Sequence, residues 1–146
     1  MGLPACLADD AVPALPQTAL TQAYGMTELA PITTLLSPAE HRKGKLRCSV
    51  GRATAHAEVR VVDDHDQVVP TGTVGEIVAR GAHVMLGYWN RPEETAKALR
   101  GGWMHTGDAG SMCTGREALC AGVQQLRALR GYRHRRATAI HEGHGV

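Results

Sequence analysis

The sequence of 146 residues contains no phenylalanine, and aromatic residues make up only 3 % of it although 43 % of its residues are hydrophobic. A core built from this chain must therefore depend on Leu, Val, Ile and Met, together with two tryptophans. No apolar run approaches the ~20 residues that a membrane-spanning helix requires. These absences favour a small globular protein with one modest core and no membrane span.

The four cysteines, Cys6, Cys48, Cys113 and Cys120, show no C-x-x-C spacing. That absence argues against a zinc site or a disulfide framework and predicts the reduced thiols of a cytoplasmic protein. The first residues also lack the charged and apolar regions of a secretory signal peptide. We therefore expect a cytoplasmic location.

Lysine is absent beyond Lys97, and the charge of the chain changes in the same region. Residues 113–146 contain six arginines and two acidic residues, a net charge of +4, whereas residues 1–112 have a net charge of −2. Basic segments are usually solvated chain. The alternative is a nucleic-acid-binding module that uses a set of arginines in this segment: Arg127, Arg130, Arg133, Arg135 and Arg136.

Two short motifs have residues suited to binding a nucleotide, Tyr24–Glu28 (YGMTE) and Thr106–Asp108 (TGD). Glycine allows a backbone to approach a ligand closely, and threonine can donate and accept a hydrogen bond at once. An ionised carboxylate accepts hydrogen bonds from hydroxyl groups or binds a hard cation. Each motif by itself is weak evidence, because a Thr-Glu pair often begins a helix and Thr-Gly-Asp often forms a turn.

Further motifs lie between these two, namely Gly75–Ile77 (GEI) and Gly87–Pro92 (GYWNRP). With these motifs in this order, the region from Gln22 to Gly110 resembles the adenylate-forming (AMP-binding) superfamily, and within it the fatty-acyl-CoA synthetases. The resemblance implies a ligase that joins a fatty or other carboxylic acid to coenzyme A. ATP and the acid first form an acyl-adenylate and pyrophosphate, and the thiol of coenzyme A then displaces AMP.

The resemblance also implies roles for individual residues. Tyr24 would lie against the adenine ring, and the backbone of Gly25 would border the nucleotide. Thr27 would contact a phosphate, and Glu28 would help to hold Mg²⁺, which makes these two the candidate catalytic residues. Asp108 would accept hydrogen bonds from the two ribose hydroxyls, which suits a carboxylate with two acceptor oxygens.

Several parts of the family's machinery have no counterpart in this sequence. No Ser/Thr/Gly-rich phosphate loop ending in Pro-Lys precedes Tyr24, and no family-type arginine follows Asp108. The family's late catalytic lysine is also missing, because no lysine follows Lys97. We therefore expect a fragment that is inactive alone. Two alternatives stay open. A companion chain could supply the missing parts, or the chain could be a degenerate remnant that binds nucleotide weakly or not at all.

The fold expected from this resemblance is mixed α/β, with largely antiparallel strands and short helices, and forms the C-terminal part of the family's large domain. Residues 1–20 are expected to be a poorly defined lead-in, residues 21–112 a partial AMP-binding domain and residues 113–146 a basic tail. The alternating segment 57–62 and the glycine-bounded segment 75–81 predict strands, with a polar turn at 63–67. Short helices are expected where Ser37–Glu40 forms a capping box, and over 91–99. Both tryptophans, Trp89 and Trp103, are expected to anchor the core.

The pattern of the family stops after Met112. Leu119–Leu129 has apolar residues at helical spacing and predicts a short amphipathic helix. We hypothesise that the residues from about Cys113 onward are disordered or out of frame with their ancestral coding, and that they do not pack on the sheet.

Overall fold

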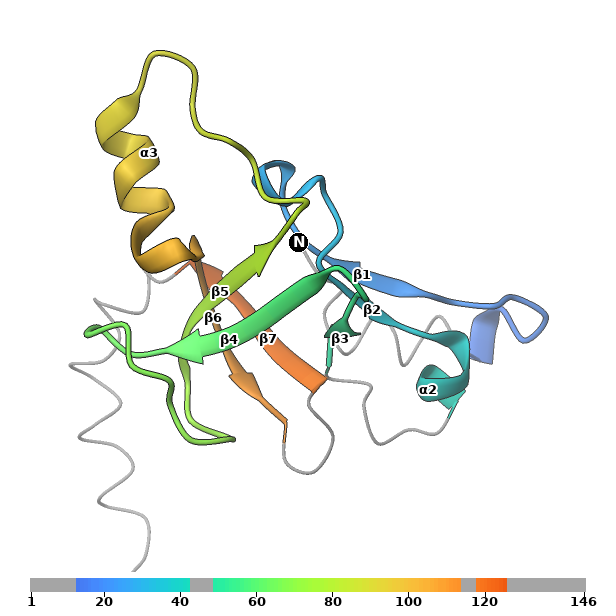
Figure 1. Cartoon of the computed structure of the whole chain (residues 1–146). Helices are drawn as coiled ribbons and strands as arrows, with labels where there is room; N and C mark the ends of the chain where they lie inside the picture. Colours follow the sequence, from blue (N-terminus) through green and yellow to red (C-terminus); the bar gives the residue numbers. More distant parts are fainter. Residues whose placement is uncertain (1–12, 43–48, 114–117, 126–146) are drawn as a thin grey trace, which may run out of the picture.

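The computed structural model describes residues 13–42, 49–113 and 118–125. Their main element is one seven-stranded sheet in the order β1-β2-β3-β7-β6-β5-β4, in which every neighbouring pair is antiparallel (Figure 1). The strands are β1 (Gln22–Tyr24), β2 (Thr34–Leu36), β3 (Gly51–Ala53), β4 (Ala57–Val62), β5 (Gly75–Gly81), β6 (Met104–Met112) and β7 (Ala118–Gln125). The expected mixed α/β fold with antiparallel strands is confirmed.

The hairpin of β4 and β5 has the arrangement that the sequence pattern predicts. β4 pairs with β5 along the whole of its length, from Ala57 opposite Gly81 to Val62 opposite Glu76. The turn after β4 is closed by Asp63, whose Oδ1 accepts the backbone N–H groups of His65 at 2.8 Å and Gln67 at 3.0 Å. A short polar side chain that bonds its own backbone favours a turn over a continued strand.

The helices that lie wholly within the described residues are short. They are α2 (Pro38–Arg42), α3 (Pro92–Ala98) and the 3₁₀ helices η1 (Thr27–Leu29) and η2 (Arg100–Gly102). The capping box of α2 is confirmed, because Glu40 Oε2 accepts from the backbone N–H of Ser37 at 3.2 Å and from its hydroxyl at 2.9 Å. Among the described residues, no helix is both long and apolar enough to cross a bilayer.

In the part of the chain that the structure describes, the core consists of two buried clusters on the sheet. One contains Tyr24, Val50, Val61, Ile77 and Leu119, and the other contains Leu29, Ala79 and Met104. The first cluster draws on residues that lie far apart in the sequence. It therefore forms only when the strands pair.

The helix expected over Leu119–Leu129 is wrong for residues 118–125, which form β7 in the middle of the sheet. Leu119 is 1 % exposed, so the expectation that the segment does not pack on the sheet is wrong for this residue as well. The free backbone edges of β3 and β6 both require hydrogen-bond partners, and this tertiary requirement overrides a local helical periodicity. The remaining part of the predicted helix and the arginines from Arg127 to Arg136 lie outside the described residues.

Two smaller expectations are also corrected. Cys113 is disulfide-bonded, so it is not the reduced thiol that its spacing suggested. Trp89 is 96 % exposed and anchors no core. Trp103 lies at the surface of the sheet, where its ring centroid is 4.5 Å from the guanidinium of Arg60 and 4.6 Å from that of Arg80. Trp103 therefore makes cation–π contacts with two guanidinium groups, one on β4 and one on β5.

Candidate active site

The first and last motifs meet through one hydrogen bond between residues 84 positions apart. Tyr24 lies at the end of β1, and its hydroxyl donates to Oδ2 of Asp108 on β6 at 2.9 Å. Burial raises the pKa of the Tyr24 phenol well above its usual value, and the nearby Asp108 and Glu76 carboxylates raise it further. The phenol therefore stays neutral and acts as a donor to the carboxylate.

The ring of Tyr24 is part of the core. It packs in the cluster with Val50, Ile77 and Leu119, and only 3 % of the residue is exposed. Stacking on an adenine ring requires a free aromatic face. The contact of Tyr24 with adenine therefore stays a prediction, while its contact with Asp108 is observed.

Gly25 follows at a place where the backbone doubles back on itself. A Cβ atom at this position would lie 1.7 Å from the carbonyl oxygen of Pro31. Such a clash is with backbone and cannot be relieved by a rotamer change, so only glycine fits. The close contact with the Pro31 backbone explains why this position is glycine. The proposed role of Gly25 beside a nucleotide stays a prediction.

Thr27 and Glu28 begin η1, immediately after this turn. Thr27 is exposed, and Oε1 of half-buried Glu28 accepts a hydrogen bond from the Tyr88 hydroxyl at 2.8 Å. This bond raises the pKa of Tyr88. The carbonyl of Glu28 also accepts the backbone N–H of Met85 at 2.9 Å. The loop that carries the GYWNRP motif is therefore tied to the YGMTE motif.

The described residues contain no group of three or more His, Cys, Asp or Glu that could hold a metal ion. Glu28 could therefore supply one protein carboxylate but not a complete metal site. Mg²⁺ in nucleotide enzymes is usually held by one or two carboxylates, with water and phosphate oxygens as its other ligands. Glu28 fits this donor set when a nucleotide brings the phosphates.

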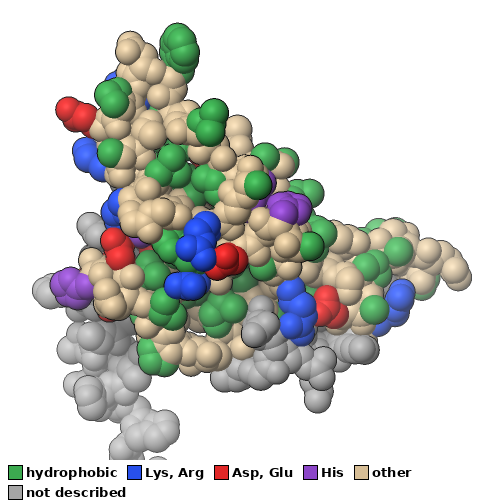
Figure 2. Space-filling view, viewed as in Figure 1, with side chains coloured by type: hydrophobic (Ala, Val, Ile, Leu, Met, Phe, Trp, Pro, Cys, Tyr) green, Lys and Arg blue, Asp and Glu red, His purple; other side chains and the backbone are tan. Residues whose placement is uncertain are grey.

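A cleft of about 740 Å³ lies beside these motifs, between α3, β6 and the loop before α3. Thr106 and Gly107 line it directly, as does Tyr88, whereas Thr27, Glu28 and Asp108 are not among its lining residues. α3 and the preceding loop form an arm that projects from the sheet, and hydrophobic side chains are visible near its tip (Figures 1 and 2). The cleft combines side chains of three kinds: apolar Met26, Trp89, Ala98 and Met104, basic Arg91, Lys97, Arg100 and His105, and acidic Glu76 and Glu94.

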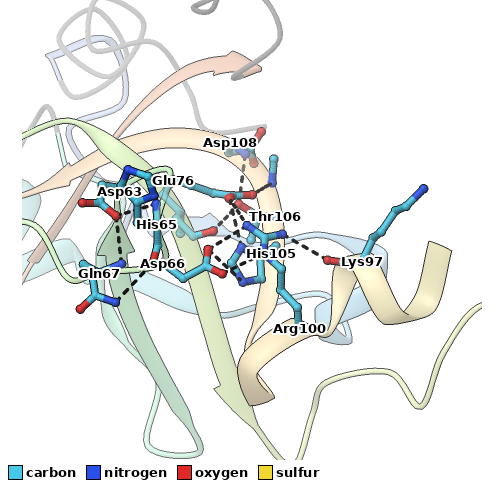
Figure 3. Close-up of polar contacts among 12 residues, drawn as sticks. Asp63, His65, Asp66, Gln67, Glu76, Lys97, Arg100, His105, Thr106 and Asp108 are labelled. Atoms are coloured by element: carbon cyan, nitrogen blue, oxygen red, sulfur yellow. Dashed lines mark hydrogen bonds and ion pairs between the residues drawn. The ribbon is translucent and has the colours of Figure 1, made fainter. Parts of the chain in front are cut away.

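A polar network beside Asp108 was not assigned from the sequence. The Glu76 carboxylate contacts both Arg100 and His105, and Arg100 also binds Asp66 in the turn after β4 (Figure 3). The GEI motif marks Glu76 as a residue of interest in the sequence, but it does not show which residues the Glu76 carboxylate contacts. Tyr88, in the GYWNRP motif, was missed for the same reason.

Comparison with known proteins agrees with these motifs. The family model of AMP-binding enzymes matches residues 1–89. This chain belongs to the AMP-binding enzyme family. The match includes the YGMTE and GEI motifs and ends before Thr106–Asp108.

The curated relatives of this AMP-binding chain include acyl-CoA ligases. A long-chain-fatty-acid–CoA ligase of Escherichia coli is 40 % identical over 95 residues, covering 64 % of this chain and 16 % of the ligase. A feruloyl-CoA synthase of an Amycolatopsis species is 45 % identical over 94 residues, covering 64 % of this chain and 19 % of the synthase. The chain therefore spans less than a fifth of the length of these relatives.

Solved structures of adenylate-forming enzymes share the fold. The o-succinylbenzoate CoA synthetase of Bacillus subtilis, in complex with its acyl-adenylate intermediate, matches with a TM-score of 0.73 at 30 % identity, over 83 % of this chain and 30 % of that one. The amide bond synthetase of Marinactinospora thermotolerans matches with a TM-score of 0.68 at 39 % identity, over 74 % of this chain and 22 % of that one. The seven-stranded sheet is therefore a fold found in this family.

Proposed function

We propose that this chain is part of an ATP-dependent acyl-CoA ligase and contributes residues that hold the nucleotide. The main support for this proposal is the Tyr24–Asp108 hydrogen bond, because it joins the YGMTE and TGD motifs, which lie 84 residues apart in the sequence. The named relatives, a fatty-acid–CoA ligase and a feruloyl-CoA synthase, support a carboxylic acid and coenzyme A as the other substrates. The complete enzyme would form an acyl-adenylate and pyrophosphate, then a thioester and AMP.

Asp108 holds the ribose in this proposal. Its Oδ2 accepts a hydrogen bond from the Tyr24 hydroxyl, and the carboxylate as a whole offers about four acceptor lone pairs. One hydrogen bond from Tyr24 therefore leaves acceptor capacity for both ribose hydroxyls. The buried phenol also restrains the carboxylate, so less conformational freedom is lost when a nucleotide binds.

Thr27 and Glu28 act on the phosphates. The exposed Thr27 hydroxyl contacts a phosphate oxygen, and Glu28 provides the protein carboxylate for Mg²⁺, an ion that neutralises phosphate charge when it is bound. Tyr88 holds Glu28 through its 2.8 Å hydrogen bond and thereby orients the carboxylate. A ligand carboxylate is commonly oriented by such a hydrogen-bonded neighbour.

The binding test uses the chain with AMP and 2′-deoxy-AMP, because only AMP offers both ribose hydroxyls to Asp108. We expect weak binding, with AMP preferred over the deoxy nucleotide by about tenfold. In Asp108→Ala the preference should disappear, while Asp64→Ala, a matched change in the exposed turn after β4, should retain it. Equal affinity of the unmodified chain for both nucleotides, measured by calorimetry or NMR titration, would contradict the proposed role of Asp108.

The isolated chain is not expected to catalyse the complete reaction. Its sequence contains neither a Pro-Lys phosphate loop before Tyr24 nor any lysine after Lys97, and a positioned cation is worth orders of magnitude in reactions at phosphorus. Incubation with ATP, Mg²⁺, a fatty acid and coenzyme A should release no pyrophosphate at rates near the ~10 s⁻¹ typical of enzymes. Turnover at that rate would show that the missing parts are dispensable.

A further inference from the structure

The TGD motif lies in an irregular part of the β5–β6 ladder. Glu76 is opposite Ala109 and Val78 is opposite His105, so the register shifts between these two pairs. Ile77 is the only residue of β5 in this interval, whereas β6 contributes all three residues of the motif. A bulge of this kind leaves backbone groups of the longer strand without regular ladder partners.

Side chains take the place of the missing ladder bonds. The Thr106 hydroxyl donates to the carbonyl of Ile77 at 2.7 Å and accepts the backbone N–H of Asp108 at 3.1 Å. The backbone N–H of Gly107 donates to Oε1 of Glu76 at 3.0 Å. Gly107 has φ +74°, a conformation that glycine adopts without strain. The bulge is therefore held by Thr106 from within and by Glu76 from the neighbouring strand.

The carboxylate of Glu76 is itself held in place. Its Oε2 contacts Nδ1 of His105 at 3.0 Å and a terminal nitrogen of Arg100 at 3.3 Å. Arg100 in turn donates to both carboxylate oxygens of Asp66, at 2.9 and 3.0 Å (Figure 3). Only 16 % of the Glu76 side chain is exposed, compared with 56 % for Glu58 on β4, which binds Arg80 instead. Glu76 is thus the more restrained of these two carboxylates.

We propose that Glu76 is a positioning residue that holds the Gly107 bulge and thereby aims the Asp108 carboxylate at the ribose. The inference rests on the proposed nucleotide function for its consequence in binding. The bulge itself does not depend on that function. Because Asp108 is the residue after Gly107, a change in the Gly107 backbone alters the direction of the Asp108 side chain directly.

Amide hydrogen exchange of Gly107, measured by NMR on the full chain, tests the contact without any ligand. Although Gly107 is exposed, its amide should exchange at least about tenfold more slowly than an unprotected amide because it donates to Glu76. In Glu76→Ala this protection should be lost. In Glu76→Gln it should be retained, because the amide oxygen of glutamine can still accept the bond.

Glu58→Ala is the matched control, since it removes a carboxylate and its ion pair with Arg80 from the adjacent strand without touching the bulge. It should leave the exchange of Gly107 unchanged. Exchange at the unprotected rate in the unmodified chain, retained protection in Glu76→Ala, or the same loss in Glu58→Ala would each overturn the proposal. If Glu76→Ala does not fold, the unmodified chain and Glu76→Gln still decide it.

The consequence for binding is measured as the preference for AMP over 2′-deoxy-AMP. The preference should fall to about a third or less in Glu76→Ala, since Asp108 is no longer aimed, and should persist in Glu76→Gln and Glu58→Ala. If the unmodified chain shows no preference, the proposed nucleotide function fails, while the exchange of Gly107 still decides whether Glu76 holds the bulge. A preference that survives in a folded Glu76→Ala would overturn the positioning role alone.

Discussion

The Tyr24 side chain combines a ring packed in the core with a hydroxyl bonded to the half-buried Asp108 carboxylate. Tyr88 makes a similar bond, from its hydroxyl to Glu28, but 38 % of Tyr88 is exposed. The two residues therefore form a natural pair for comparison. Their hydroxyls have partners of the same kind and differ mainly in burial.

Replacing Tyr24 by phenylalanine should lower the free energy of unfolding by about 2 kcal/mol, because the ring is kept while a partly buried carboxylate loses its donor. Tyr88→Phe should cost only about 0.5 kcal/mol, because water can replace the lost hydroxyl at an exposed position. Urea unfolding of both variants checks the difference. Equal losses would show that burial does not distinguish the two bonds.

The same tyrosine should make the fold sensitive to alkaline pH. Burial raises the pKa of Tyr24 in the folded chain above the value near ~10 that it has when unfolded. The folded state therefore holds the phenol proton more tightly, so this stabilisation is complete below pH ~10 and decreases as the pH rises beyond it.

Urea midpoints measured between pH ~8 and pH ~11 should fall more steeply for the unmodified chain than for Tyr24→Phe. Tyr88→Phe is the comparison variant: the pKa of Tyr88 is also raised, chiefly by its bond to Glu28, so this change should flatten the slope as well, but less than Tyr24→Phe because Tyr88 is far more exposed. A slope unchanged by Tyr24→Phe would assign the alkaline sensitivity to other groups.

At the scale of elements, β7 has the most consequential position. Its partners are β3, through Gly51 opposite Leu119, and β6, through Met112 opposite Leu119. The carbonyl of Leu119 also accepts the Val50 amide at 2.9 Å and the Ser49 hydroxyl at 2.8 Å. Leu119 is thus paired with a strand on each side and buried in the core cluster.

Leu119→Ala should destabilise the chain by about 3 kcal/mol, through lost burial and the cavity that remains. Leu35→Ala on β2 is the matched control, because 39 % of Leu35 is exposed and its truncation should cost less than about 1 kcal/mol. Thermal or urea unfolding compares the two variants. If Leu119→Ala left the free energy of unfolding unchanged, β7 would not pack as described, and the result would support the hypothesis that the tail does not pack on the sheet.

At the scale of the whole molecule, β7 joins two groups of strands, β1-β2-β3 on one side and β6-β5-β4 on the other. The core cluster also spans both groups, since Tyr24 and Val50 pack with Val61 and Ile77. The backbone pairing and the core therefore depend on each other. Removing β7 exposes two sheet edges and opens this cluster.

A chain that ends after Gln125 contains all seven strands and should unfold in one cooperative transition. A chain that ends after Met112, the boundary expected for the partial AMP-binding domain, should lose that cooperativity because β3 and β6 no longer share a neighbour. Circular dichroism during urea unfolding, with a size measurement for aggregation, distinguishes the two. Equal cooperativity of both chains would place the boundary at Met112 after all.

The features that the sequence predicted correctly depend on neighbours along the chain. Alternation over 57–62, the turn aspartate Asp63 and the capping box of Ser37 and Glu40 each require contacts within a few residues, so local chemistry determines them. The ordered motifs from YGMTE to TGD likewise predict the AMP-binding family, and the family match over residues 1–89 confirms it.

Tertiary structure decided what lies across the sheet. The segment 119–129 has apolar residues at helical spacing, yet residues 118–125 form a strand because β3 and β6 present backbone groups that need partners. Tyr24 reaches Asp108, and Glu76 reaches Gly107, only after β1, β5 and β6 take their places in one sheet. Pairing in a sheet joins residues without regard to their separation in sequence, so no local pattern could show which carboxylate holds which backbone group.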